Sequence, residues 1–241
     1  MTDEIDVIAP KAKAGRAELN KWEITARDRI KAALPIVMKE LKKLDAADAV
    51  EANTRIVVTE ILTQALGYDK FDELTAEYLV KGDFADIGLR INKQIIAFVE
   101  IKRIKQQLKS AHLRQVESYA LRDGVDWAIL TNGREWQVYH VRPRKNEQSE
   151  LTLVFGVDLL NDETKPSEKR DLLFFISREG LSKGRLETLW KTKEAASPET
   201  LKAVLLSDPV LNQIRLQVRQ HKKQNLELHE IRSAIEGLLK S

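Results

Sequence analysis

Two neighbouring stretches of the chain decide its fold: DFADIGLRI at residues 83–91 and IIAFVEIK at residues 95–102. Both have the length and apolar content of a β-strand. Because side chains alternate between the two faces of a strand, Glu100 and Lys102 point to the same side. The run from Ile95 to Val99 is apolar at every position, which is typical of a strand covered on both faces. The two charges are therefore expected beside a buried core.

The connection between these strands decides whether two carboxylates meet. A two-residue turn, Asn92-Lys93, would put Asp86 opposite Val99, on the wrong face for Glu100. A three-residue connection, 92–94, sets Asp86 directly across from Glu100, and this is the register we expect. In general the site needs an odd number of connecting residues, or a bulge. Carboxylates facing each other repel, and either a raised pKa or a hard cation such as Mg²⁺ resolves that conflict.

The order of the polar motifs resembles a known family. Asp86, Glu100-Ile101-Lys102 and the stretch from Gln115 to Tyr119 resemble the D…ExK…QxxxY set of PD-(D/E)XK nucleases, and more narrowly the type I restriction enzyme R protein N-terminal domain. The flanking sequences, ALGY before the motif and LTNGREW after it, stand in the family's order. Alanine at position 85 replaces the family's usual proline, which shapes the backbone and binds no metal.

This resemblance implies a restriction-endonuclease-like α/β fold with a mixed central sheet flanked by helices. It also implies metal-dependent hydrolysis of phosphodiester bonds. Asp86 and Glu100 would hold Mg²⁺ or Mn²⁺, with the carbonyl of Ile101 as a further ligand. Lys102 would orient the attacking water or stabilise the charged phosphate.

Three further residues are candidates for the site. Gln115 and Tyr119 lie one turn apart on a helix expected from about residue 106 to 122, closed by Gly124. Taken alone, Tyr119 would be a core residue and Gln115 a surface amide. After ExK at this distance, the pair resembles the family motif that orders the site and contacts the DNA backbone. Glu60 borders the apolar stripe of an earlier helix, where it is either an edge residue paired with Arg55 or Lys70, or a site residue.

The rest of the chain suggests a tail, a domain and an extension: residues 1–15, 16–160 and 161–241. Asn132-Gly133 between two apolar runs predicts a β-hairpin. Pro35 is expected to kink or divide a helix over residues 17–44, and a capping pattern at 48–51 to open the next one. Beyond residue 161 the pattern is helical, with Ser197-Pro198 and Asp208-Pro209 as helix starts. The last helices could pack on the core, or form a dimer or partner surface.

Composition narrows the possible classes of protein. Among 241 residues, 43% are hydrophobic and 32% charged, and the net charge is +3. No apolar run is long enough to cross a bilayer and no leader is present, so we expect a cytoplasmic protein with no membrane partner. The lack of cysteine excludes disulfides, thiolate zinc sites and cysteine nucleophiles.

The expected partner is DNA, bound through its phosphates. Basic clusters flank the motif at residues 102–109 and 142–145, although such runs are more often solvated surface. The resemblance implies a nuclease of restriction or phage-defence type, and because no phosphate-binding Gly-x-x-x-x-Gly-Lys loop is present, we expect it to act without its own motor. Two alternatives remain open: a non-catalytic DNA-binding or assembly module with this fold, and a structural protein in which Glu100 and Lys102 form a surface ion pair.

Overall fold

The structure is a computed structural model that describes residues 19–80, 83–143 and 149–239. The expected tail, residues 1–15, lies outside these ranges. The chain divides into two compact units, the first ending at Glu187 and the second starting at Thr188. The first contains the whole sheet and the candidate site.

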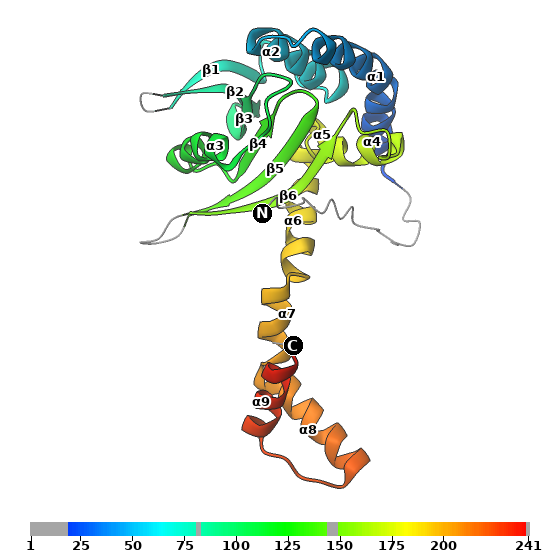
Figure 1. Ribbon diagram of the computed structural model, residues 1–241, viewed down its shortest axis with the longest axis vertical. Coiled ribbons are helices and arrows are strands. Elements are labelled where there is room, and N and C mark those ends of the chain that lie inside the picture. The colour runs from blue at the N-terminus through cyan, green and yellow to red at the C-terminus, as the bar shows by residue number, and fades with distance from the viewer. Residues whose placement is uncertain (1–18, 81–82, 144–148, 240–241) are drawn as a thin grey trace. The chain divides into compact units, whose positions relative to one another are not determined.

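A six-stranded sheet forms the centre of the first unit (Figure 1). Its strands are β1 (Leu74–Val80), β2 (Asp83–Ile91), β3 (Gln94–Ile101), β4 (Trp127–Thr131), β5 (Glu135–Arg142) and β6 (Glu150–Asp158). They lie side by side in sequence order, and only β3 and β4 run parallel, because helix α3 connects them. The expected mixed α/β architecture is therefore confirmed.

The β2–β3 hairpin reaches the required register through a two-residue turn combined with a β-bulge. Ile91 pairs with Gln94, so the turn is the two-residue one, and the positive φ angles of Asn92 and Lys93, 51° and 67°, are those of a type I′ turn. The expected three-residue connection is wrong. Ile96, however, forms a bulge between the pairs Arg90–Ile95 and Leu89–Ala97.

That bulge restores the parity that the short turn loses. Beyond it, Gly88 pairs with Phe98 and Ile87 with Val99. Counting one residue further brings Asp86 opposite Glu100, as the site requires. The physical reason is that one extra residue on one strand shifts every later side chain to the other face.

Helix α3 (Ser110–Asp123) covers one face of the sheet. Its Val116, Tyr119 and Ala120 pack against Phe98 and Leu130 in a single hydrophobic cluster. The helix starts later than expected, because residues 102–109 form an irregular segment, and it ends at Gly124 with φ 67° as expected.

Helices α1 (Lys21–Ala46) and α2 (Glu51–Glu60) lie across the sheet from α3 (Figure 1). Pro35 does not divide α1, whose Leu34 and Val37 are buried on either side of it. The N-cap of α2 is Val50, so the expected cap at Asp48 is wrong: Asp48 has φ 47° and belongs to the turn after α1. A π-helical turn, η1 (Ile61–Ala65), continues α2. The chain leaves the helical conformation at Gly67, which has a positive φ, as expected.

The expected hairpin at Asn132-Gly133 joins β4 and β5. Asn132 holds the turn by accepting a 2.7 Å hydrogen bond from the backbone N–H of Glu135. Gly133 has φ 82°, and a Cβ there would come within 3.1 Å of Leu41 on α1. Glycine therefore allows both the turn and the close approach of α1.

The helices after the sheet do not form one extension. Helices α4 (Pro166–Phe175) and α5 (Arg178–Ser182) pack along α1, where Arg27 pairs with Asp171 and Arg29 with Glu179. The helical segment up to Glu187 thus belongs to the first unit, whereas the sequence pattern placed the start of the extension at residue 161. The change from strands to helices does not reveal this long-range packing. Helix α6 (Arg185–Ala195) crosses from the first unit to the second.

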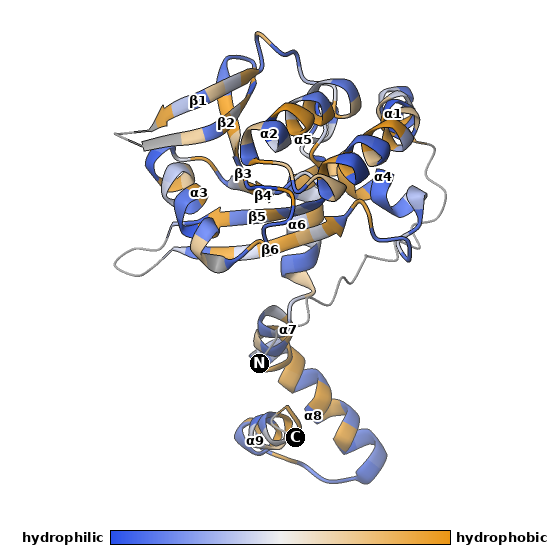
Figure 2. Ribbon diagram, turned by 45° about the horizontal axis from the view of Figure 1, so that its top comes forward, coloured by the Kyte–Doolittle hydropathy of each residue, from blue (hydrophilic) through white to orange (hydrophobic). Residues whose placement is uncertain are grey.

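The second unit contains α7 (Pro198–Leu205), α8 (Asp208–Lys222) and α9 (Leu228–Leu238). Ser197 caps α7 as expected, but Ser207 rather than Asp208 is the N-cap of α8. Polar and apolar residues alternate along α8 (Figure 2). Helices α8 and α9 pack against each other, and Leu211 of α8 and Ile231 of α9 are buried. Across the part of the chain that the structure describes, no helix is both long and apolar enough to span a membrane.

Candidate active site

Asp86 lies where the pairing of β2 with β3 ends and where its pairing with β1 is interrupted by one residue. The pairing with β1 passes from Ile87 to Ala85 without including Asp86, and the pairing with β3 stops at Ile87. One carboxylate oxygen of Asp86 instead accepts a 2.7 Å hydrogen bond from the backbone N–H of Ile101. The other oxygen accepts a short hydrogen bond from Arg55. These two contacts fix the orientation of the carboxylate beside the end of β3.

Glu100 and Lys102 form a buried ion pair in this place. The Lys102 Nζ lies 2.5 Å from Oε1 of Glu100, and the exposed fractions of their side chains are only 14% and 1%. The second oxygen of Glu100, Oε2, is buried and has no hydrogen-bond partner in the described residues. A buried acceptor without a partner typically costs about 1–3 kcal/mol. Glu100 therefore keeps a strong ligand oxygen unused.

The surroundings raise the pKa of both residues. Burial raises the pKa of Glu100 to about 7, and the negative charges of Asp86 and Glu51 act in the same direction against the stabilising Lys102. Burial alone would lower the pKa of Lys102, but the hydrogen bond to Glu100 and the charges of Glu100, Glu51 and Asp86 raise it instead. Lys102 is thus a cation at neutral pH, whereas Glu100 is poised between its two forms.

Two residues of α2 that the sequence did not indicate belong to this cluster. Arg55 donates to Asp86 and also lies 3.6 Å from Glu77 on β1. Glu51, one turn earlier on the same helix, is close enough to raise the pKa of both Glu100 and Lys102. Their spacing of four residues, at the start of a helix that precedes the motif, was the available signal.

A comparison with known protein families finds a match over the part of the chain that contains the motif. Residues 50–154 match the family of the type I restriction enzyme R protein N terminus (HSDR_N). This match confirms the narrower resemblance, to the R-protein N-terminal domain, and residues 50–154 are named the R-protein segment. No curated protein and no solved structure matches the chain.

Glu60 lies at the far end of α2 in the R-protein segment. Nine residues separate it from Glu51, or about 13 Å along the helix axis. Its side chain is exposed. Arg55, its expected partner, pairs with Asp86 and Glu77 instead. A surface cavity of about 630 Å³ runs along α2 and is lined by Glu51, Arg55 and Glu60. The structure thus brings Glu51, rather than Glu60, to the Glu100–Lys102 pair.

Gln115 and Tyr119 form a hydrogen-bonded pair on α3, as their spacing predicted. The Gln115 side-chain amide donates to the Tyr119 hydroxyl at 2.9 Å. The Tyr119 ring is buried and packs edge-on against Phe98, with the ring centres 6.3 Å apart. Phe98 lies two residues before Glu100 on β3, and hence on the same face. Tyr119 is thus a core residue whose polar end holds an exposed amide near the site.

His112, which the sequence analysis did not select, also lies beside the cluster. Its Nδ1 accepts a 3.2 Å hydrogen bond from the backbone N–H of Lys109, so the neutral ring carries its proton on Nε2. Nε2 faces the side-chain amide of Gln106 at 3.0 Å. Burial lowers the pKa of His112, and the positive charges of Lys102 and Lys109 lower it further. Burial and the two lysine charges therefore favour the neutral form of His112.

The basic residues near the site divide into two kinds. Lys102 is paired with Glu100, and Arg103 lies 3.8 Å from Asp48. Lys105 and Lys109 are exposed on the segment that leads into α3. In the second predicted cluster, residues 144 and 145 lie outside the described ranges. No group of three or more acidic or histidine side chains that could hold a metal ion occurs in the described ranges. A metal would have two carboxylates and backbone or water oxygens as ligands.

Proposed function

We propose that this chain is a metal-dependent nuclease of the PD-(D/E)XK type, which hydrolyses phosphodiester bonds of DNA in a restriction or phage-defence system. The observation that carries the proposal is the unpartnered, buried Oε2 of Glu100. This oxygen belongs to a carboxylate whose pKa is raised by burial and by Asp86, which lies across from it. A site that only stabilised the fold would gain by satisfying that oxygen.

The residues present fit a hard divalent cation. Asp86 and Glu100 would hold Mg²⁺ or Mn²⁺, and the carbonyl of Ile101, whose backbone N–H donates to Asp86, is the further ligand that we propose. Each Asp86 oxygen has one hydrogen bond and can accept another. When bound, the cation polarises the phosphoryl oxygen, generates a nucleophilic water and stabilises charge on the leaving oxygen.

Lys102 supplies the positive charge that acts on the substrate itself. Its ammonium carries three protons, and Glu100 uses one of them. The others can orient an attacking water or donate to the phosphate oxygens as negative charge builds on them. Because burial weakens the competing interactions with water, such a donor stabilises the transition state more than an exposed lysine would.

DNA would be held by groups around this centre. The exposed amide of Gln115, oriented by Tyr119, and the exposed Lys105 and Lys109 can contact the sugar-phosphate backbone. Such contacts carry no sequence information, so specificity would come from elsewhere. Lysines that neutralise phosphates also make binding strongly dependent on salt.

One observation favours the non-catalytic alternative. Lys102 and Arg55 already neutralise the two carboxylates without a metal. In a DNA-binding or assembly module, these pairs would simply hold β2, β3 and α2 together. The pairs are buried or half-buried, unlike the surface ion pair of the third hypothesis.

A titration of Mg²⁺ and Mn²⁺ with and without supercoiled plasmid separates these functions. A nuclease should raise its melting temperature with either cation and nick or linearise the plasmid only when the cation is present. A DNA-binding module should shift plasmid mobility without cutting it. A structural protein should do neither. Absence of cleavage across pH 6–9 with both cations, in protein that binds DNA, would refute the nuclease proposal.

The roles of Glu51 and Glu60 can be compared within one helix. We expect Glu51→Gln to lower the rate of metal-dependent cleavage by about three- to tenfold, because the charge of Glu51 acts on Glu100 and Lys102. Glu60→Gln is expected to change it less than twofold, because the side chain is exposed and remote from the pair. Initial cleavage rates at saturating Mg²⁺ give both numbers. A larger loss in Glu60→Gln than in Glu51→Gln would return Glu60 to the site.

A further inference from the structure

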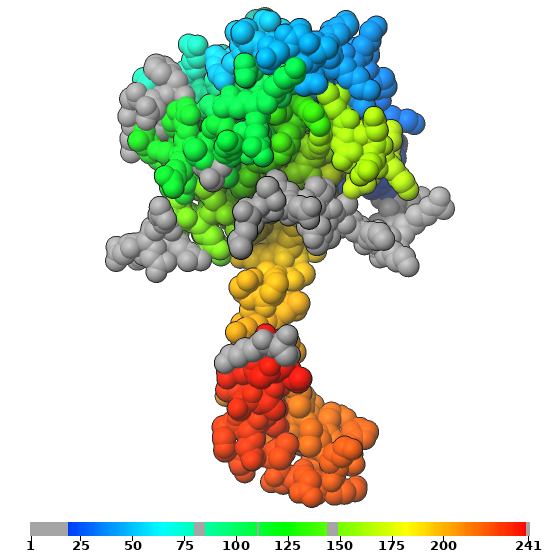
Figure 3. All heavy atoms as spheres, viewed as in Figure 1, coloured from blue at the N-terminus to red at the C-terminus, as the bar shows by residue number. Residues whose placement is uncertain are grey.

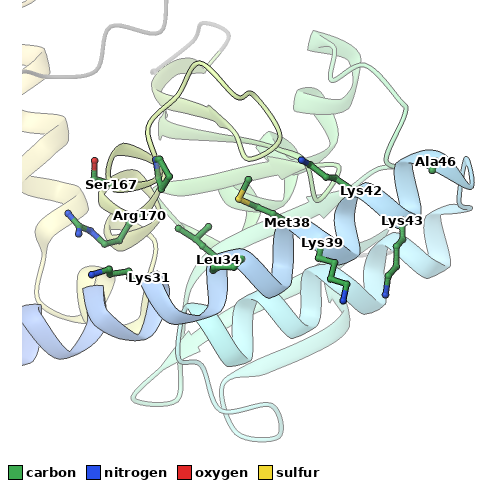
Figure 4. A pocket seen from close by; sticks show the side chains of 11 residues that line it. Lys31, Leu34, Met38, Lys39, Lys42, Lys43, Ala46, Ser167 and Arg170 are labelled. Atoms are coloured by element: carbon green, nitrogen blue, oxygen red, sulfur yellow. The ribbon is translucent and has the colours of Figure 1, made fainter.

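A second cavity lies far from the candidate active site, between α1 and α4. Its volume is about 970 Å³, and Leu34, Pro35 and Met38 form its apolar floor. In Figure 4, Leu34 and Met38 project from α1 on the side of α4. Helix α1 lies at the outer surface of the first unit (Figure 3).

The rim of this cavity is strongly basic. Lys31, Lys39, Lys42 and Lys43 of α1 and Arg170 of α4 surround the apolar floor. Lys43 pairs with Glu40, and Arg170 pairs with Asp171. Lys31, Lys39 and Lys42 are exposed and have no ion-pair partner within the described ranges. An apolar floor with three unneutralised lysines suits a segment that combines apolar and acidic side chains.

The chain itself contains such a segment. Residues 3–8 read DEIDVI, three acidic and three apolar side chains within six positions. They lie outside the described ranges, and the 12 residues 9–20 connect them to α1. Those 12 residues can span up to about 40 Å. Met38 lies 17 residues beyond the start of α1, or about 26 Å along the helix. The segment can therefore reach the cavity within one molecule.

We propose that residues 3–8 bind in the cavity between α1 and α4, with their apolar side chains on Leu34 and Met38 and their carboxylates on Lys31, Lys39 and Lys42. Charge selects this cavity over its neighbour. The neighbouring cavity on α1, about 480 Å³ and lined by Ile36, carries Glu40 and Glu60, and its one basic side chain, Arg29, is paired with Glu179. An acidic segment is repelled there. Attachment within one chain raises the effective concentration to about millimolar, so even a weak contact is populated.

The absence of native cysteine allows a direct test in the full chain. The variant Ile5→Cys/Met38→Cys should form an intramolecular disulfide under mild oxidation at least about tenfold faster than Ile5→Cys/Ile36→Cys. Ile36 is the matched control, because it is two residues away, has nearly the same tether and is 68% exposed in the neighbouring cavity. Gel mobility without reductant, followed by peptide mass spectrometry, measures both rates.

Charge-reversal variants provide a second part of this experiment. Adding Lys31→Glu and Lys42→Glu to the Met38 pair should slow disulfide formation about tenfold, because two exposed ion pairs are lost and replaced by repulsion. Raising the salt to 1 M should slow it in the unchanged background. Equal rates at positions 36 and 38 would overturn the proposal, as would a rate insensitive to the charge reversals. A disulfide that forms only between two chains would overturn the assignment to the same molecule.

Discussion

Replacing Asp86 with alanine should abolish Mg²⁺-dependent cleavage of plasmid DNA, with a loss of at least about 10³-fold in initial rate. Asp86 would supply one of the two carboxylate ligands proposed for the metal. Lys102→Ala should have a similar effect, because it removes the positive charge proposed to act on the attacking water and the reacting phosphate. Gel-based nicking assays at saturating Mg²⁺ measure both losses.

The matched control is Lys105→Ala, three residues beyond Lys102 on the same segment. Lys105 is exposed, so its loss should reduce cleavage only about twofold and mainly through DNA affinity. Lys102→Ala also leaves Glu100 buried without its partner, which can cost several kcal/mol. Circular dichroism and DNA binding must therefore confirm that each variant folds. Undiminished cleavage by folded Asp86→Ala protein would refute the assignment.

The affinity for Mn²⁺ should depend on pH with a step near pH 7. Burial, followed by the charges of Asp86 and Glu51, raises the pKa of Glu100 to about 7, whereas a metal binds only the ionised carboxylate. Below pH 7 a proton competes, so the apparent affinity should fall up to about tenfold per pH unit. Calorimetry at pH 5.5–8.5 measures this slope. About one proton should be released on binding at pH 6, and almost none at pH 8.5.

The control for this prediction is Glu100→Gln, which keeps the shape of the side chain. This variant should bind Mn²⁺ more weakly at pH 8 and lose the step near pH 7. The raised pKa of Glu100 also affects the free energy of unfolding. The folded protein holds the Glu100 proton up to about pH 7, whereas the unfolded chain loses it near 4.5. The free energy of unfolding should therefore fall as pH rises from 4.5 to 7, by an amount on the order of 3 kcal/mol from this group. A flat affinity across this range would contradict the expected role of Glu100.

Much of the fold could be predicted because its signals are local. The Asn132-Gly133 turn, the Gly124 and Gly67 helix ends and the Ser197 cap depend on a few adjacent residues. The mixed sheet follows from the same logic, since the helix between β3 and β4 allows parallel pairing and the hairpins require antiparallel pairing. The order of D, ExK and QxxxY likewise indicated the R-protein family that residues 50–154 match, without any contact between distant residues.

Asp48 and residue 161 show where local signals fail. Asp48 has the residue type of an N-cap, but the turn after α1 holds it at a positive φ, and Val50 takes its place. Residue 161 begins a helical pattern, but α4 and α5 pack on α1 through Arg27 and Arg29. Both outcomes depend on partners more than a hundred residues away or on the preceding helix. Propensity and periodicity do not contain that information.

For the β2–β3 site, the sequence alone determined which residues bear charge and which parity they need. Tertiary structure decided the rest. It chose a two-residue turn and restored the parity with a bulge at Ile96, it buried Glu100 to 1% exposure, and it brought Arg55 and Glu51 from α2. The physical reason is that alternation along a strand is a local property of the backbone, whereas the burial and the charges that set a pKa come from whichever elements pack against it.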